Sequence, residues 1–227
     1  MPDAKPYLPP IRKPNRRRLS RDEKARLTRE SLLGAGYRVV AADGYAAASI
    51  AKIAETAGVA HGTFYNYFLD RQELFDQILP YEGLQMREKV EQAARKAPAG
   101  MEREYARFEA FLDYVASNDG FYRVLYEAEI FAVEAHRAHM ENIVSGYKRT
   151  FGRAMTEGRM RRLDDCELEC LIYQILGMRA YAAMQIHSAE SPEKKLRIKR
   201  AAVEMYRLLL SHSLFETSVA AGRNTSA

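Results

Sequence analysis

Residues 49–68 read SIAKIAETAGVAHGTFYNYF, and this stretch decides the fold of the chain. Ile53, Ala54 and Val59 are spaced so that two short helices can pack against each other. Gly58 stands between them, where a tight turn requires a positive φ that glycine adopts without strain. The stretch therefore predicts a helix that Ser49 caps and that ends at Ala57, then a second helix at about 61–67. Helix, turn and helix together form the unit whose second helix enters the major groove of DNA.

Two capping boxes frame this unit. Ser20 and Glu23 can satisfy each other's backbone N–H groups, so we expect a helix over about 21–43 that Asp43-Gly44 ends. Asp70 and Glu73 form a second box and open another helix. Pro80 should kink or stop that helix, because proline lacks the N–H and clashes with the preceding turn.

Beyond residue 80 every periodic segment has helical spacing, and no period-2 strand pattern is present. The last two long helices are expected at about 165–187 and 192–216, the second opened by Ser191-Pro192-Glu193. The sequence predicts an all-α protein.

Length and composition exclude several classes of protein. The chain has 227 residues, of which 47% are hydrophobic and 29% charged, as in an ordinary globular protein. No run of about 18 apolar residues could span a membrane, and no apolar segment follows the basic N-terminus to make a secretory signal. Two cysteines fit a reducing compartment. We expect a cytoplasmic protein without a membrane partner.

The positive charge is concentrated at one end. Residues 1–30 hold ten Lys or Arg and four Asp or Glu, whereas the other 197 residues, with 25 basic and 26 acidic side chains, are nearly neutral. Five prolines within residues 1–19 favour a disordered, extended arm. The arm carries Arg16, Arg17 and Arg18 and suggests a polyanionic partner. The alternative is a solvated tail.

The second helix of the unit carries groups that can reach DNA. Phe64 and Phe68 are i, i+4 partners and belong to the core. The side chains around them are short, polar or aromatic and suit phosphates or base edges: His61, Gly62, Thr63, Tyr65, Asn66 and Tyr67.

This segment resembles the tetracycline-repressor (TetR) family of bacterial transcription regulators. The resemblance rests on Gly44, Ser49, Ile53, Ala54, Ala57-Gly58-Val59, Gly62-Thr63, Tyr65, Tyr67-Phe68 and Glu73-Leu74, and it is strong over about 21–79. It implies an all-α dimer of about nine helices per chain. Residues 20–80 would then form a three-helix DNA-binding domain, residues 81–218 an effector-binding and dimerisation domain, and residues 219–227 a flexible tail.

The resemblance also implies roles for single residues. His61 and Gly62 would approach base edges, and Thr63 and Tyr65 would contact bases or phosphates. The remaining phosphate contacts would come from Ser49, Asn66, Tyr67 and Arg71. The chain departs from the family pattern at Ala60, where a Ser or Thr cap is usual, and at His61, where Lys or Arg is common. The arm with Arg16–Arg18 would enter the minor groove or act as a nonspecific tether.

The expected effector site is aromatic. Inward-facing tyrosines in the helical body need partners for their hydroxyls, so Tyr122, Tyr126, Tyr147 and Tyr173 are candidates to line a cavity. Arg179 lies on an apolar stripe, where a lone charge is costly. It either pairs with Glu127, Glu129 or a carboxylate across a dimer interface, or it grips an anionic effector such as a carboxylate or an acyl-CoA phosphate.

Metal and redox chemistry are not expected. His136 and His139 are interpreted as surface histidines, and Cys166 and Cys170 as ordinary half-buried thiols, since their spacing is not a zinc motif. We expect no metal and no cofactor.

The sequence thus predicts a homodimeric transcription regulator, most simply a repressor. A small apolar or aromatic effector, with or without an anionic group, would release it from a palindromic double-stranded operator. An architectural DNA-binding protein without an effector is the alternative. An enzyme is disfavoured, because no GxSxG, P-loop or HExxH motif is present.

Overall fold

The computed structural model describes residues 20–118 and 120–214, and over these ranges the chain forms nine helices and no strand. The all-α expectation is therefore confirmed. The helices are α1 (Arg21–Asp43), α2 (Ile50–Ala57), α3 (His61–Phe64), α4 (Arg71–Ala94), α5 (Met101–Ser117), α6 (Phe121–Phe131), α7 (Val133–Thr156), α8 (Asp165–His187) and α9 (Pro192–Leu214).

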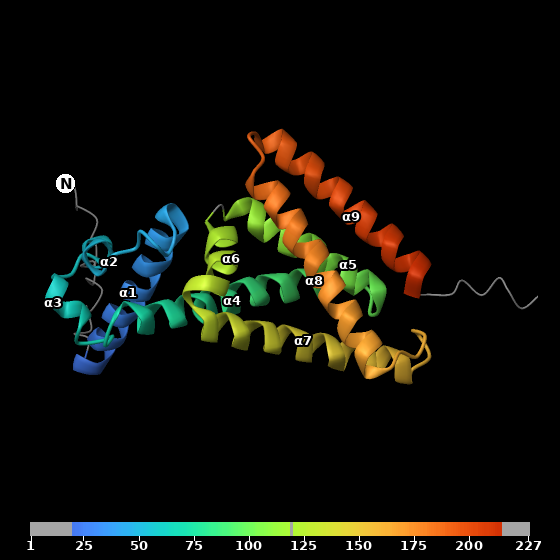
Figure 1. Ribbon diagram of the computed structural model, residues 1–227, viewed down its shortest axis with the longest axis horizontal. Helices are drawn as coiled ribbons and strands as arrows, with labels where there is room; N and C mark the ends of the chain where they lie inside the picture. Colours follow the sequence, from blue (N-terminus) through green and yellow to red (C-terminus); the bar gives the residue numbers. More distant parts are fainter. Residues whose placement is uncertain (1–19, 119, 215–227) are drawn as a thin grey trace, which may run out of the picture.

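The molecule is elongated, with α1, α2 and α3 gathered at one end (Figure 1). Helix α4 begins at that end and runs into the body formed by α5 to α9. Helices α8 and α9 form a hairpin on the side of the body away from α1–α3. None of the described helices is long and apolar enough to span a membrane.

Local signals set the ends of α1. The Ser20 hydroxyl accepts from the Glu23 N–H at 3.1 Å, and the Glu23 carboxylate accepts from the Ser20 N–H at 2.8 Å. The predicted capping box is thus present. At the other end Gly44 has a φ of 84° and donates to the Val40 carbonyl, so the helix ends at Asp43 as expected.

Helix α4 does not stop at Pro80. It continues fourteen residues further to Ala94, so of the two expected effects of this proline, a kink or a stop, the stop does not occur. Proline has no N–H to donate to the backbone carbonyl four residues earlier. Because Pro80 is exposed, water can bind that carbonyl. The expected boundary between two domains at residue 80 therefore falls inside one continuous helix. Asp70 caps α4 as expected, but the Glu73 carboxylate accepts from the Leu69 N–H, not from that of Asp70.

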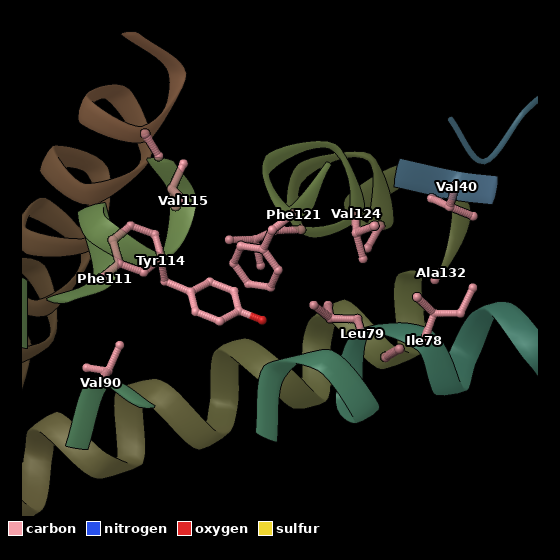
Figure 2. Packing of buried hydrophobic residues seen from close by; sticks show 14 of the residues in the cluster. Val40, Ile78, Leu79, Val90, Phe111, Tyr114, Val115, Phe121, Val124 and Ala132 are labelled. Carbon is pink, nitrogen blue, oxygen red and sulfur yellow. The ribbon is translucent and has the colours of Figure 1, made fainter. Parts of the chain in front are cut away.

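One continuous hydrophobic core joins the two ends of the molecule. Figure 2 shows Val40 of α1 and Ile78 and Leu79 of α4 in the same packed layer as Tyr114 of α5 and Phe121 of α6. Because α1 and α4 share this layer with the body, a shift of the body against them changes buried contacts directly.

The C-terminal helices also follow the sequence signals. Asp164 and Glu167 form a reciprocal capping box at the start of α8. Ser191 accepts from the Lys194 N–H at the start of α9. Helix α8 has the expected range, and α9 is described as far as Leu214.

Candidate DNA interface and effector site

The α2–turn–α3 unit is held by caps and by the turn glycine. The Ser49 hydroxyl accepts from the Lys52 N–H at 3.2 Å and so caps α2. Gly58 has a φ of 71° in the left-handed region, and its N–H donates back to α2. Val59 then donates to the Ala54 carbonyl at 3.0 Å. These bonds fix the direction in which α3 leaves the turn.

Two buried phenyl rings anchor helix α3 to the core. Phe64 and Phe68 are 0% and 1% exposed, with their centroids 5.5 Å apart. The helix itself covers only His61–Phe64, and residues 65–67 continue as a hydrogen-bonded turn, so the expected range of 61–67 was too long for a regular helix. Ala60 provides no side-chain cap, and a helix of four residues gains little from propensity. Packing of the two phenyl rings therefore holds it.

The side chains of this segment that lie away from Phe64 and Phe68 are exposed to solvent. His61, Gly62, Tyr65 and Asn66 are exposed, and the Tyr65 side chain is 53% exposed. A methyl group built on Gly62 would meet no atom within 4 Å, so another molecule can approach the backbone there. The predicted DNA residues of α3 are thus brought together on one surface.

Other predicted DNA residues lie around this surface. Thr63 and Tyr67 are partly buried, and Ser49 is exposed while it caps α2. The exposed Arg71 side chain braces the base of the unit, because its guanidinium donates to the Ala48 carbonyl at 3.3 Å and lies 5.2 Å from the Phe75 ring centroid. The basic residues Arg16, Arg17 and Arg18 lie outside the described residues.

Arg179 is paired inside the chain. Its Nη2 lies 3.2 Å from Oε1 of Glu104 in α5, and the Glu104 side chain is only 3% exposed. Pairing with Glu127 or Glu129 was expected and is not what the structure shows. The Glu127 carboxylate instead faces Arg123 and the backbone of Tyr45.

Glu104 accepts hydrogen bonds from three helices. Its Oε1 also accepts from the hydroxyls of Tyr147 in α7 and Tyr206 in α9, at 2.8 and 2.9 Å. Burial raises the pKa of both phenols. Burial alone would lower the pKa of Arg179, but Tyr147 and Glu104 outweigh it and raise that pKa. The Arg179 guanidinium therefore stays ionised at any ordinary pH.

Sequence patterns did not point to Glu104. It lies on α5 among several acidic residues, Glu102 and Glu109 included, and nothing in the spacing singles it out. Only its burial between four helices distinguishes it from the exposed carboxylate of Glu102.

The predicted ligand residues divide into two groups. Tyr126 lies near Arg179 and Tyr122, and the Tyr122 and Tyr126 rings are 4.5 Å apart. Tyr147 contacts Arg179, with the guanidinium 5.4 Å from its ring centroid. Tyr173 is different, because it is 50% exposed and lies near Lys148 at another part of α8. The structure therefore brings four of the five residues toward one region and leaves Tyr173 outside it.

Two minor interpretations need correction. His139 is not a surface histidine, since it packs against Gly83 of α4, and burial together with His136 and Arg87 lowers its pKa to about 4. Cys166 and Cys170 are exposed rather than half-buried. No group of three or more metal-ligating side chains occurs among the described residues.

An open apolar groove runs between α8 and α9. Residues from both helices line it, with Phe108 and Tyr206 at its inner side. Tyr181, Met205 and Leu209 line the groove and are exposed. Met184 of α8 and Leu196 and Leu208 of α9 are exposed as well. A surface of this kind marks an interaction site.

Helix α6 connects the body to α1. Glu127 accepts from the Tyr45 N–H at 3.0 Å, and Arg123 donates to the Ala41 and Ala42 carbonyls at 3.3 and 2.5 Å. Gly120 packs so closely on Ala41 that an added methyl group would lie 2.1 Å from the Ala41 Cβ. This α6–α1 joint places the body in direct contact with the helices that position α3.

The fold and the α2–turn–α3 unit define a helix-turn-helix protein with a helical body. Residues 32–78 match the family model of bacterial regulatory proteins of the tetR family. This match confirms, over these residues, the resemblance noted in the sequence.

One curated relative is similar in sequence, and solved structures are similar in fold. The chain is 35% identical over 115 residues to the HTH-type transcriptional activator FasR of Mycolicibacterium smegmatis. That match covers 50% of this chain and 51% of the relative, so the chain spans about half the length of that relative.

The fold is similar to that of a TetR-family transcriptional regulator from Pectobacterium atrosepticum, with a TM-score of 0.65 at 21% identity, over 86% of this chain and 97% of that one. It is also similar to the transcriptional regulator FadR from Bacillus subtilis, solved in complex with stearoyl-CoA. That TM-score is 0.66 at 16% identity, over 78% and 96% of the two chains.

Proposed function

We propose that this chain is a sequence-specific DNA-binding transcription regulator that responds to a small-molecule effector and acts as a homodimer. The observation that carries the proposal is the surface of α3, where His61, Gly62, Tyr65 and Asn66 are exposed above two buried phenylalanines. Exposed aromatic and polar groups on a rigidly anchored helix suit base and phosphate contacts.

The roles of the single residues follow from this surface. We propose that His61 and Gly62 approach base edges, and that Tyr65 and Asn66 contact bases or phosphates. Thr63, Tyr67, Ser49 and Arg71 would contact phosphates at the edges of the unit. A partly buried or bonded side chain is held in place, which suits a residue that fixes register and not sequence.

The N-terminal and C-terminal parts of the chain have different proposed roles. We propose that residues 20–80 bind DNA and that residues 81–218 bind the effector and form the dimer. Helix α4 belongs to both parts, and α6 contacts α1 through Glu127 and Arg123. A displacement of α6 by an effector would therefore move the two recognition surfaces of a dimer relative to each other.

The apolar faces of α8 and α9 support dimer formation. Two such helix pairs can bury their exposed leucines, methionines and tyrosines in a four-helix contact. A closed two-fold dimer reads a near-palindromic operator with half-sites roughly 34 Å apart.

The effector class is proposed from the body and its relatives. Aromatic and apolar side chains around Arg179 favour an apolar or aromatic effector. The similar FadR structure contains stearoyl-CoA, which supports an acyl compound as one candidate. Repression is the simplest mode of action, but the similar FasR is a transcriptional activator, so the sign of regulation is an outcome of the test. We propose binding and regulation, not catalysis, in the bacterial cytoplasm where the DNA lies.

Selection of bound sequences from random duplex DNA tests the proposal, with salt at a physiological level because affinity for DNA depends on it. Recovery of one inverted repeat is expected. Uniform, salt-sensitive binding without enrichment would overturn site-specific regulation and favour an architectural DNA-binding protein. In vitro transcription from a promoter that carries the repeat then gives the sign.

A further inference from the structure

The guanidinium of Arg179 has a balanced charge but an unused donor. Glu104 takes the Nη2 bond at 3.2 Å, and the side chain as a whole is 15% exposed. Its Nε is buried and has no acceptor among the described residues. A buried N–H without an acceptor destabilises the fold, so this donor would gain from an acceptor supplied by another molecule.

Arg179 and its neighbour Arg107 are each paired with a carboxylate. Arg107 pairs with Glu91 at 2.7 Å and lies 3.6 Å from Oε2 of Glu104. The pair Arg107 and Arg179 thus faces the pair Glu91 and Glu104. Glu104 thus already supplies the counter-charge of Arg179, and a carboxylate brought beside Glu104 would meet a buried like charge.

Oε1 of Glu104 has no lone pair left to accept from Nε of Arg179. Oε1 of Glu104 already receives Tyr147, Tyr206 and Arg179, three donors to one oxygen that has two lone pairs. Because no acceptor among the described residues reaches Nε, another molecule would have to supply one.

The surroundings of the guanidinium are aromatic. The rings of Phe111 in α5 and Tyr147 in α7 lie 5.7 and 5.4 Å from it. Tyr126 of α6 lies close enough for Arg179 to affect its pKa, which burial raises. Tyr122 is half-buried, and its ring stacks on His187 at a centroid distance of 4.7 Å. Aromatic side chains around one unused donor suit contact with an apolar molecule that carries one polar atom.

We propose that Arg179 Nε donates a hydrogen bond to an uncharged acceptor of the effector, a carbonyl oxygen of an ester, thioester, ketone or amide. Glu104 holds Arg179 in place and excludes carboxylates and phosphates from this position. The proposal rests on the proposed function for its regulatory consequence, and it replaces the expectation that Arg179 grips an anion.

Matched ligand pairs test this inference on the full-length protein. The probes are methyl decanoate with decanoate, and methyl benzoate with benzoate, measured by calorimetric titration at neutral pH. The wild-type protein is expected to bind the ester of at least one pair about tenfold more tightly than the acid. Equal affinities, tighter binding of the acids, or no binding of either pair overturns the inference.

Two variants identify the groups responsible. Glu104→Gln keeps the shape but leaves Arg179 without its counter-charge, so the preference should move toward the carboxylate by about tenfold or more. The double variant E104Q/R179M removes both charges together and should lose the ester preference while it stays folded, because no unpaired charge remains. Glu102→Gln, on the exposed part of α5, is the matched control and should bind as the wild type does.

Operator binding separates the two proposals. Wild type and E102Q should both retain the selected operator when no ligand is present. Intact operator binding without ester preference would overturn only the inference about Arg179, whereas failure to select any operator would overturn the proposed function.

Discussion

The carboxylate of Glu127 in α6 accepts a hydrogen bond from the backbone N–H of Tyr45, 3.0 Å away, at the point where α1 has just ended. Gly44, directly before Tyr45, packs on the same carboxylate and has a φ of 84°, so a larger side chain would both clash and be strained there. The Tyr45 hydroxyl also donates to the Val124 carbonyl in α6. The body therefore holds the backbone that leads into α2 and α3.

Loss of this acceptor should loosen the joint. Glu127→Ala leaves the Tyr45 N–H without its partner and removes the counter-charge of Arg123, so we expect a loss of about 1–3 kcal/mol in the free energy of unfolding. Operator affinity should fall severalfold, because the recognition surfaces are held less firmly. Urea unfolding and operator titration measure the two effects. Glu129→Ala, an exposed carboxylate of the same helix, should change neither.

Close packing of α6 on α1 should make Gly120 intolerant of alanine. Its φ of −83° suits any residue, so only space is at issue. A methyl group there would lie 2.1 Å from the Ala41 Cβ and 2.8 Å from its Cα. We expect Gly120→Ala to destabilise the fold by about 1–3 kcal/mol. Gly152→Ala, in α7 with no atom within 4 Å of the new methyl, should be neutral or stabilising by about 0.5–1 kcal/mol. The same thermal unfolding curve for both variants would contradict this account of the joint.

Tyr65 should affect DNA binding and not the fold. The side chain is 53% exposed and touches His61 and Phe64 only at ring edges. Tyr65→Ala is expected to weaken operator binding about tenfold, with a change in unfolding free energy within about 0.5 kcal/mol. Fluorescence anisotropy of labelled operator measures the affinity, and Gln92→Ala on the exposed side of α4 is the control. Wild-type affinity in the Tyr65 variant would remove this residue from the interface.

His139 should make stability depend on pH. Its pKa is lowered to about 4, against an ordinary value of 6.5, by burial and by nearby His136 and Arg87. Between these values the unfolded chain binds the proton more tightly, so stability is lost as pH falls from 6.5 toward 4, by at most about 1.4 kcal/mol per pH unit.

The matching variant is His139→Gln, which cannot gain the proton. Its free energy of unfolding, measured in urea at several pH values across this range, should fall less steeply than that of the wild type. Asn142→Ala, an exposed neighbour on α7, should keep the wild-type slope. Parallel slopes for the wild type and the glutamine variant would show that His139 is accessible to protons in the folded protein.

Helix ends were predictable where neighbouring residues decide them. Ser20 with Glu23, Gly44 and Gly58 mark the ends of α1 and α2 through bonds that span a few residues. The exposed surface of α3 followed from the same local pattern, because Phe64 and Phe68 fall on one face and Tyr65 and Asn66 fall off it. Short-range hydrogen bonds and helical periodicity need no knowledge of the rest of the fold.

Residues far apart along the chain were not predictable in this way. Arg179 was correctly identified as a charge that needs a partner, but its partner Glu104 lies 75 residues away on another helix. Helix α4 passes Pro80 because packing of α4 on α1 and α5 outweighs a local penalty. Tyr173 has helical spacing like its neighbours, yet it faces outward.

The sequence by itself determined the all-α class, the ends of most helices and the helix-turn-helix unit, since each depends on contacts within about one or two turns of the chain. Tertiary structure alone decided that Glu104 meets Arg179 and that Glu127 holds Tyr45. Many acidic residues on different helices could have met these groups, and only the three-dimensional packing of α5 on α8 and of α6 on α1 selects one carboxylate for each.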